Sequence, residues 1–218
     1  MDSSFLVSGV MKVIPLVLSL TVHEFAHAWS AWKLGDDTAM RQGRLTLNPL
    51  VHIDPIGSLL LPLMGIPFGW AKPVPVNPAA FRRDVSMSRG MMITAAAGPL
   101  SNVVLALLCT VTYGLSLRWA PGFMLANPGV EALLGTMIVM NISLALFNML
   151  PVPPLDGSRV LEGLLPTRLQ ASYQRLYALS PFLLLGVFFF GGKLIGGPFA
   201  YVAQMMTRLI HNISGAMG

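Results

Sequence analysis

Charged side chains are scarce in this sequence. Asp, Glu, Lys and Arg make up 11% of its 218 residues, whereas 54% of the residues are hydrophobic. A soluble domain contains about 25% charged residues. This shortage excludes an ordinary water-soluble globule and predicts a protein that lies in a membrane. The length allows one compact membrane domain, residues 1–218, with no sizeable soluble domain beside it.

The sequence also indicates no internal disulfide, no signal peptide and no nucleic acid partner. The single cysteine, Cys109, cannot form an internal disulfide, and we interpret it as a small buried apolar residue. No basic region precedes the first apolar segment and no small-residue cleavage pattern closes it, so we expect no signal peptide. The net charge of +5 requires no nucleic acid partner, because juxtamembrane arginines beside anionic lipid account for it.

Four charge-poor segments have, or nearly have, the length needed to cross about 30 Å of hydrocarbon at about 1.5 Å per residue. They are residues 5–32, 90–117, 132–155 and 176–192. Residues 194–207 form a shorter apolar stretch, for which we expect a re-entrant or interfacial position. We therefore predict an all-α multi-pass membrane protein with about four transmembrane helices. Its core covers residues 5–165, and a C-terminal span with an interfacial segment covers residues 170–215.

The connection between the first two spans is expected to be more than a simple loop. Polar and apolar residues alternate from Arg44 to Asn48, which is typical of a strand. Residues 56–70 are apolar but broken by glycines and prolines, and residues 72–78, "KPVPVNP", can only be extended or turning. We predict a short β element together with a re-entrant segment. Such backbone exists at membrane depth only where protein or a water-filled cavity covers it.

Basic residues indicate the orientation in the membrane. Seven lie from Lys33 to Arg89 and three from Arg159 to Arg175, whereas the loop between the second and third spans has only Arg118. Cytoplasmic loops are enriched in Lys and Arg. The first and third loops are therefore predicted to face the cytoplasm.

The segment "HEFAH" places three polar residues within an apolar span. His23 and His27 are four residues apart, so on a helix they share one face. The pattern His-Glu-x-x-His gives a zinc ion two imidazole ligands and places Glu24 to take a proton from water. The alternative is a structural cluster satisfied by neighbouring helices. We disfavour it because ionisable groups inside a span are costly unless they serve a function.

A catalytic zinc site needs a third protein ligand, and Asp156 is the first candidate. The prolines in residues 151–154 interrupt the helix before it, and Gly157 is expected to free the backbone to turn. An unwound, charged segment at the end of a span is expected only where it lines a polar site. With Zn²⁺, two neutral imidazoles and the carboxylates of Asp156 and Glu24, the group would be neutral.

The other acids and histidines have simpler interpretations. His52 and Asp54 lie in a proline-rich turn, where they either contribute to the site or act as turn and capping residues. Glu162 lies near arginines and is interpreted as their solvated partner. His211 is interpreted as an interfacial histidine.

The two motifs together closely resemble the site-2 protease family of intramembrane zinc metalloproteases. The family's second motif, Asn-x-x-Pro-x-Pro-x-Leu-Asp-Gly, is matched by residues 148–157, and "AAAGPLSN" (residues 95–102) resembles its Gly-Pro-x-x-Asn segment. The resemblance covers most of residues 5–165. No stretch can house a PDZ domain or a soluble regulatory domain, so the chain resembles a short form of the family.

The resemblance implies an enzyme, a zinc-dependent metalloendopeptidase that cleaves peptide bonds in or near transmembrane segments of other membrane proteins during regulated intramembrane proteolysis. It implies one Zn²⁺ per chain held by His23, His27 and Asp156, with Glu24 as general base. We also expect a multi-pass protein of a prokaryotic cell membrane, in contact with lipid, whose active site opens to the cytoplasmic side.

Two asparagines keep alternative interpretations. Asn148 either holds the substrate carbonyl or its oxyanion, or makes hydrogen bonds between helices. For Asn102 we prefer helix packing. An added substrate strand at Arg44–Asn48 is a further hypothesis. A metal transporter would have no need of Glu24, and an inactive homologue is disfavoured because every catalytic position is present.

Overall fold

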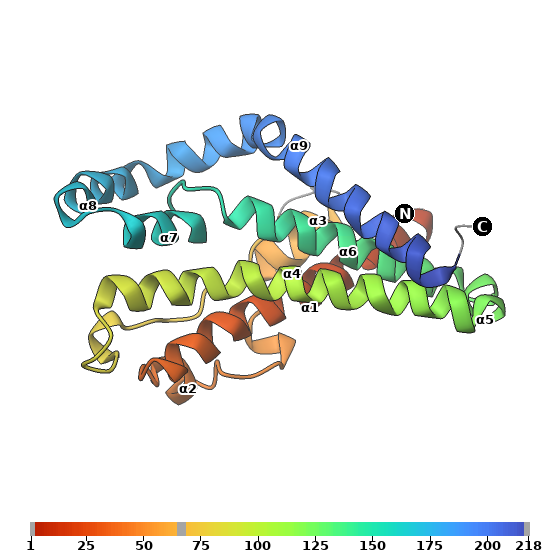
Figure 1. Ribbon diagram of the computed structural model, residues 1–218, viewed down its shortest axis with the longest axis horizontal. Coiled ribbons are helices and arrows are strands. Elements are labelled where there is room, and N and C mark those ends of the chain that lie inside the picture. Colours follow the sequence, from red (N-terminus) through yellow and green to blue (C-terminus); the bar gives the residue numbers. More distant parts are fainter. Residues whose placement is uncertain (1–2, 65–68, 216–218) are drawn as a thin grey trace.

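Four long helices form the body of the protein in a computed structural model that describes residues 3–64 and 69–215. These helices are α1 (Ser3–Lys33), α4 (Met87–Trp119), α6 (Pro128–Asn148) and α9 (Ser180–Ser214). Helix α4 lies along the long axis of the molecule and packs against α1, α6 and α9 (Figure 1). The described residues contain no β-strand.

Short elements collect at the two ends of the body. One end, which we call the α7 end, carries α2 (Thr38–Arg41), α7 (Asp156–Leu164) and α8 (Thr167–Gln174). The opposite end carries α5 (Pro121–Ala126) and both termini of the drawn chain (Figure 1). The remaining short helical pieces are η1 (Pro49–Val51), η2 (Pro55–Leu60), α3 (Leu61–Leu63), η3 (Pro78–Ala80) and η4 (Arg175–Leu179).

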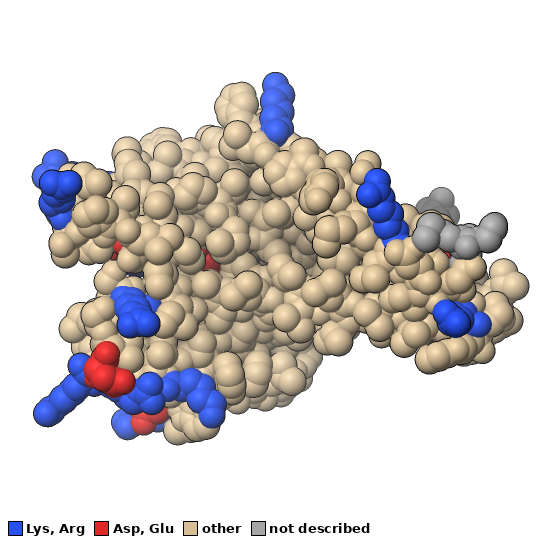
Figure 2. All heavy atoms as spheres, in the orientation of Figure 1, with Lys and Arg blue, Asp and Glu red and all other residues tan. Residues whose placement is uncertain are grey.

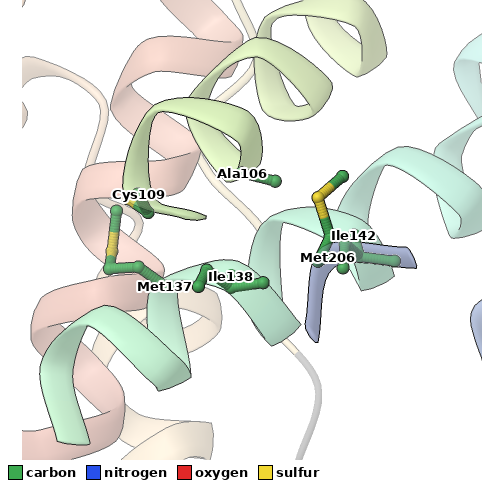
Figure 3. Packing of buried hydrophobic residues seen from close by; sticks show 6 residues of the cluster. All are labelled: Ala106, Cys109, Met137, Ile138, Ile142 and Met206. Atoms are coloured by element: carbon green, nitrogen blue, oxygen red, sulfur yellow. The ribbon is translucent and has the colours of Figure 1, made fainter. Parts of the chain in front are cut away.

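Small and apolar side chains hold α4 against its neighbours. One buried cluster joins α4, α6 and α9 and consists of Ala106, Cys109, Met137, Ile138, Ile142 and Met206 (Figure 3). Cys109 is free and buried, as predicted. Further along α4, a Cβ atom added to Gly114 would lie 2.8 Å from the Cβ of Ile213. Glycine at this position therefore lets the two helices approach closely.

Three stretches are long and apolar enough to cross a membrane, namely α4, α6 and Thr167–Ser214, which ends with α9. They agree with a multi-pass helical protein. Helix α1, predicted as the first span, is helical but is not among these three, and it carries Lys12 and Glu24 as well as two histidines. The prediction of four spans is therefore not confirmed.

Of two predicted interruptions of the apolar stretches, one is confirmed and one is wrong. Within residues 132–155, α6 ends at Asn148 and Asp156 begins α7, so the interruption predicted from the prolines at residues 151–154 is observed. Residues 194–207 were expected as a separate short piece, but they continue α9 as one helix of 35 residues. Helix α9 bends in its middle (Figure 1), near Pro198 and two pairs of glycines, without ending there.

The strand predicted from Arg44 to Asn48 is absent, because its polar groups bind neighbouring loops. The buried Arg44 guanidinium donates to the carbonyl oxygen of Lys72, and His52 Nε2 donates to the carbonyl oxygen of Thr46 at 2.9 Å. Alternation of polar and apolar residues does not ensure that a partner strand lies beside the segment. The prediction of a β element at Arg44–Asn48 is therefore wrong. In the predicted re-entrant region, η2 and α3 are helical, and residues 65–68 lie outside the described residues.

Candidate metal centre

Two histidines of α1 and the first residue of α7 meet in one place. His23 Nε2 lies 3.1 Å from Asp156 Oδ2, His27 Nε2 lies 3.4 Å from the same oxygen, and the two Nε2 atoms are 3.0 Å apart. Among the described residues, this is the one group of three or more His, Cys, Asp or Glu close enough to hold a metal ion. Residues 133 positions apart are thereby joined.

Both imidazole rings are held by their other nitrogen. His27 Nδ1 lies 2.7 Å from the carbonyl oxygen of Thr94, and His23 Nδ1 lies 2.6 Å from Asn102 Oδ1. A carbonyl oxygen only accepts hydrogen bonds, so His27 Nδ1 carries the proton and the lone pair of Nε2 faces the centre. A hydrogen-bond acceptor behind each ring is the usual arrangement around histidines that bind metals.

The spacing of these atoms fits zinc. Zinc binds imidazole nitrogen and carboxylate oxygen at about 2.0–2.2 Å in a tetrahedron, which places neighbouring ligand atoms about 3.3–3.5 Å apart. The three separations in this group, 3.0, 3.1 and 3.4 Å, lie at this spacing or 0.2–0.3 Å below it, so small side-chain shifts bring all three atoms to a common ion. Three protein ligands also leave a fourth position open, as a catalytic site requires. The residues present therefore fit a catalytic zinc ion.

Close backbone contacts place Asp156 at this point. A Cβ atom on Gly157 would collide with the carbonyl oxygen of Met149, so the start of α7 can pack on the preceding loop only with glycine there. The predicted reason for Gly157, freedom to turn, was wrong, since its φ is not positive. Two tyrosines stabilise this region: Tyr173 donates to the carbonyl oxygen of Pro151 at 3.0 Å, and Tyr177 lies 3.0 Å from the buried Ser158 hydroxyl.

Glu24 lies beside the group and has its own partner. The backbone N–H of Val74 donates to Glu24 Oε2 at 2.9 Å. Val74 belongs to residues 69–77, which contain neither helix nor strand and thus agree with the predicted extended or turning backbone. The loop between α1 and α4 therefore reaches back to the carboxylate that follows His23.

A glycine of α4, Gly98, lies against the imidazole rings of His23 and His27. A Cβ atom on Gly98 would overlap His27 Nε2 and lie 2.6 Å from His23 Nε2. The absence of a side chain at Gly98 thus keeps the space around the proposed ligand atoms free.

We expect Gly98→Ala to reduce bound zinc to well below one ion per chain, because the added methyl group occupies the position of the imidazole nitrogens. Metal content of the purified protein measures this effect. Gly135→Ala, in α6, is the control, since a Cβ there meets nothing within 4 Å. Full zinc content in Gly98→Ala would contradict this account of the site.

The other residues considered from the sequence lie outside the metal group. Asp54 accepts from the backbone N–H groups of Ile56 and Gly57, which is the capping role. His52 is buried and binds within its own loop. Asn148 donates to the carbonyl oxygen of Leu144 in its own helix, at 3.0 Å, so its contact with a substrate stays a prediction.

Glu162 and His211 also lie elsewhere. Glu162 was interpreted as a solvated partner of arginines, and it does lie 3.5 Å from Arg159. It is also partly buried, and it accepts hydrogen bonds from Gln174 and Tyr177. His211 is exposed in the last turns of α9.

Sequence reasoning missed the residues behind the histidines. The Thr94 carbonyl was not identified, Gly98 was noted only as part of the Gly-Pro-x-x-Asn segment, Asn102 was assigned to helix packing, and Asn141, which binds Asn102, was not considered. One signal was available: Thr94, Gly98 and Asn102 recur every four residues and so form one face of α4.

Known proteins with similar sequences agree with this centre. A sequence model of peptidase family M50 matches residues 119–188, which include Asp156. YwhC of Bacillus subtilis is 42% identical over 183 residues, which are 80% of this chain and 79% of YwhC. Rip2 of Mycolicibacterium smegmatis is 34% identical over 154 residues, or 70% of this chain, and the matched part is 56% of Rip2.

An archaeal relative, MJ0611 of Methanocaldococcus jannaschii, is 47% identical over 68 residues, which are 31% of either chain. All three relatives are named as zinc metalloproteases. No solved structure matches the chain significantly. From its similarity to YwhC over most of both chains, together with the family match, the chain belongs to peptidase family M50, the site-2 protease family, and is a zinc-dependent metalloprotease.

Proposed function

We propose that this metalloprotease hydrolyses peptide bonds in or near transmembrane segments of other membrane proteins. The observation that carries the proposal is the location of the metal group. His23, His27 and Asp156 converge beside α4, a helix long and apolar enough to cross a membrane. A peptide bond that reaches this group has to pass among apolar helices, so a membrane-embedded segment is the natural substrate.

In this proposal, His23, His27 and Asp156 would hold the zinc ion, which would supply Lewis-acid activation of the scissile carbonyl and of water. Glu24 takes a proton from the water whose oxygen bonds to the carbonyl carbon. As the C–N bond breaks, Glu24 delivers that proton to the leaving amine. The Val74 N–H holds Oε2 of Glu24, so we assign the proton transfer to Oε1. Asn148 remains our candidate for holding the substrate carbonyl or its oxyanion.

The charge distribution supports an orientation. On the face shown in Figure 2, larger groups of Lys and Arg lie at the α7 end, and the middle of the body is mostly uncharged. Lys33 ends α1 at the α7 end, only six residues after His27, or about 9 Å along a helix. We therefore propose that the α7 end faces the cytoplasm and that the site opens toward it.

Cysteine labelling tests the orientation. In a Cys109→Ala background, cysteine at the exposed Arg83 should react with a membrane-impermeant reagent only from the cytoplasmic side. Cysteine at the exposed Pro128, at the opposite end of the body, should react only from outside. The reverse pattern would overturn the proposed orientation.

Cleavage of a synthetic transmembrane helix tests the function itself. Purified protein with zinc should cut a helix that contains Gly or Pro near the scissile bond faster than a matched all-leucine helix. A protease cleaves a peptide bond in extended backbone, so the substrate helix has to unwind locally. Gly and Pro weaken a helix by about 1 and about 3 kcal/mol relative to Ala. Equal membrane insertion of the two peptides is the control. No cleavage of either peptide, together with cleavage of soluble peptides, would overturn the proposed substrate class.

A further inference from the structure

A chain of buried amides runs from His23 into the helix bundle. His23 Nδ1 contacts Asn102 Oδ1 of α4, and Asn102 Nδ2 contacts Asn141 Oδ1 of α6 at 2.7 Å. Asn141 Nδ2 in turn contacts the Ser19 hydroxyl of α1 at 2.9 Å. Asn102, Asn141 and Ser19 have no exposed surface. Three helices thus meet in one polar network directly behind the metal group.

Backbone carbonyls determine which way each amide points. Asn141 lies 2.8 Å from the carbonyl oxygen of Met137, which can only accept, so the atom of Asn141 at this contact is its NH₂ group. Its oxygen therefore faces Asn102. The same argument holds for Asn102, whose NH₂ group also lies 3.3 Å from the carbonyl oxygen of Ser19. The Asn102 oxygen must then face His23.

The protonation pattern of His23 follows from this order. An amide oxygen only accepts, so His23 Nδ1 must carry the proton at this contact, and Nε2 of the neutral ring keeps its lone pair. We propose that Asn102 and Asn141 form an amide relay that fixes His23 in the Nδ1–H tautomer and directs its Nε2 atom toward the metal. Asn102 and Asn141 are positioning residues, since Asn141 touches no proposed ligand and acts through Asn102.

The two histidines differ in how they are held. A backbone carbonyl, that of Thr94, holds His27, and no side-chain substitution removes it. His23 depends on the side chain of Asn102, and Asn102 depends on Asn141. Asparagine is a poor residue in the middle of a helix, and both asparagines occupy helix interiors in apolar spans. The relay explains their presence there.

The inference rests on the proposed role of His23 as a zinc ligand, and zinc affinity tests it without a cleavage assay. We expect Asn102→Leu to weaken zinc binding by about 10- to 100-fold, the usual loss when an outer partner of a metal ligand is removed, and Asn141→Leu to weaken it in the same direction by no more than that. Competition with a chromogenic chelator measures the affinity. Thr110→Val is the matched control, because Thr110 is equally buried on α4 and its hydroxyl binds Ala106 and Met206, away from the site.

A double variant separates a relay from two independent effects. If Asn141 acts only through Asn102, then Asn102→Leu with Asn141→Leu should bind zinc as weakly as Asn102→Leu alone. If the loss of zinc affinity in the double variant equalled the product of the two single losses, the relay would be overturned. Unchanged zinc affinity in Asn141→Leu would overturn it as well.

Nitrogen-15 spectra of the histidine rings give a second readout, and its first part uses the wild-type protein alone. The chain has four histidines, so assignment is simple. In the zinc-loaded wild-type protein, we expect His23 to bind through Nε2 and to carry its proton on Nδ1, and binding through Nδ1 would overturn the inference. Asn141→Leu should shift the Nδ1–H signal of His23 but not that of His27. A wild-type protein that binds zinc but cuts no transmembrane peptide would refute only the proposed function.

Discussion

Glu24→Gln is expected to abolish peptide cleavage and to leave zinc bound. The substitution keeps the shape of the side chain and removes the group that takes the proton, while His23, His27 and Asp156 stay in place. Loss of a general base lowers the rate by about 100- to 10,000-fold. Cleavage of a transmembrane peptide and zinc content, measured on the same preparation, check the two halves of this prediction.

Glu131→Gln is the matched control for Glu24→Gln. Glu131 is a carboxylate near the start of α6, at the opposite end of the body, where it accepts from the Tyr113 hydroxyl at 2.6 Å. Its loss should leave the cleavage rate unchanged. If Glu24→Gln kept more than a few per cent of the wild-type rate, the role assigned to Glu24 would be wrong.

Asp156→Ala is expected to remove both zinc and activity. The carboxylate oxygen of Asp156 lies within 3.4 Å of both histidine nitrogens, and without it only two ligand atoms remain. Two imidazoles alone make a weak zinc site, because protein zinc sites use three or four ligands. Metal analysis of the purified variant measures the loss.

Asp84→Ala provides the comparison for Asp156→Ala, since Asp84 is exposed and lies in the loop before α4. It should retain one zinc ion per chain. Stoichiometric zinc in Asp156→Ala would move the third ligand to another residue.

The proposed ligands could be predicted from the sequence because each depends on a short pattern. A spacing of four residues places His23 and His27 on one face of any helix, and the prolines before Asp156 mark the end of α6. Their meeting with Asp156 required the packing of α1, α4 and α7, which no spacing encodes. Family resemblance supplied that step.

The polar support behind the histidines could not be predicted in the same way. Asn102 and Asn141 lie 39 residues apart on different helices, and only the packed bundle brings their amides together. Likewise, the alternation from Arg44 to Asn48 suggested a strand, but whether a partner strand lies beside it is a property of the tertiary structure. The boundary predicted at residue 194 failed because local breakers differ in effect: prolines follow the end of α6, as predicted, whereas Pro198 only accompanies a bend in α9.

The four-residue recurrence of Thr94, Gly98 and Asn102 has a consequence for related sequences. Inserting or deleting one residue within 94–102 rotates one end of this face against the other by about 100°. Either the carbonyl behind His27 or the amide behind His23 would then point away, although "HEFAH" and "LDG" would remain intact. The length of this segment, compared across relatives, therefore separates competent enzymes from degenerate copies that the two motifs alone would group together.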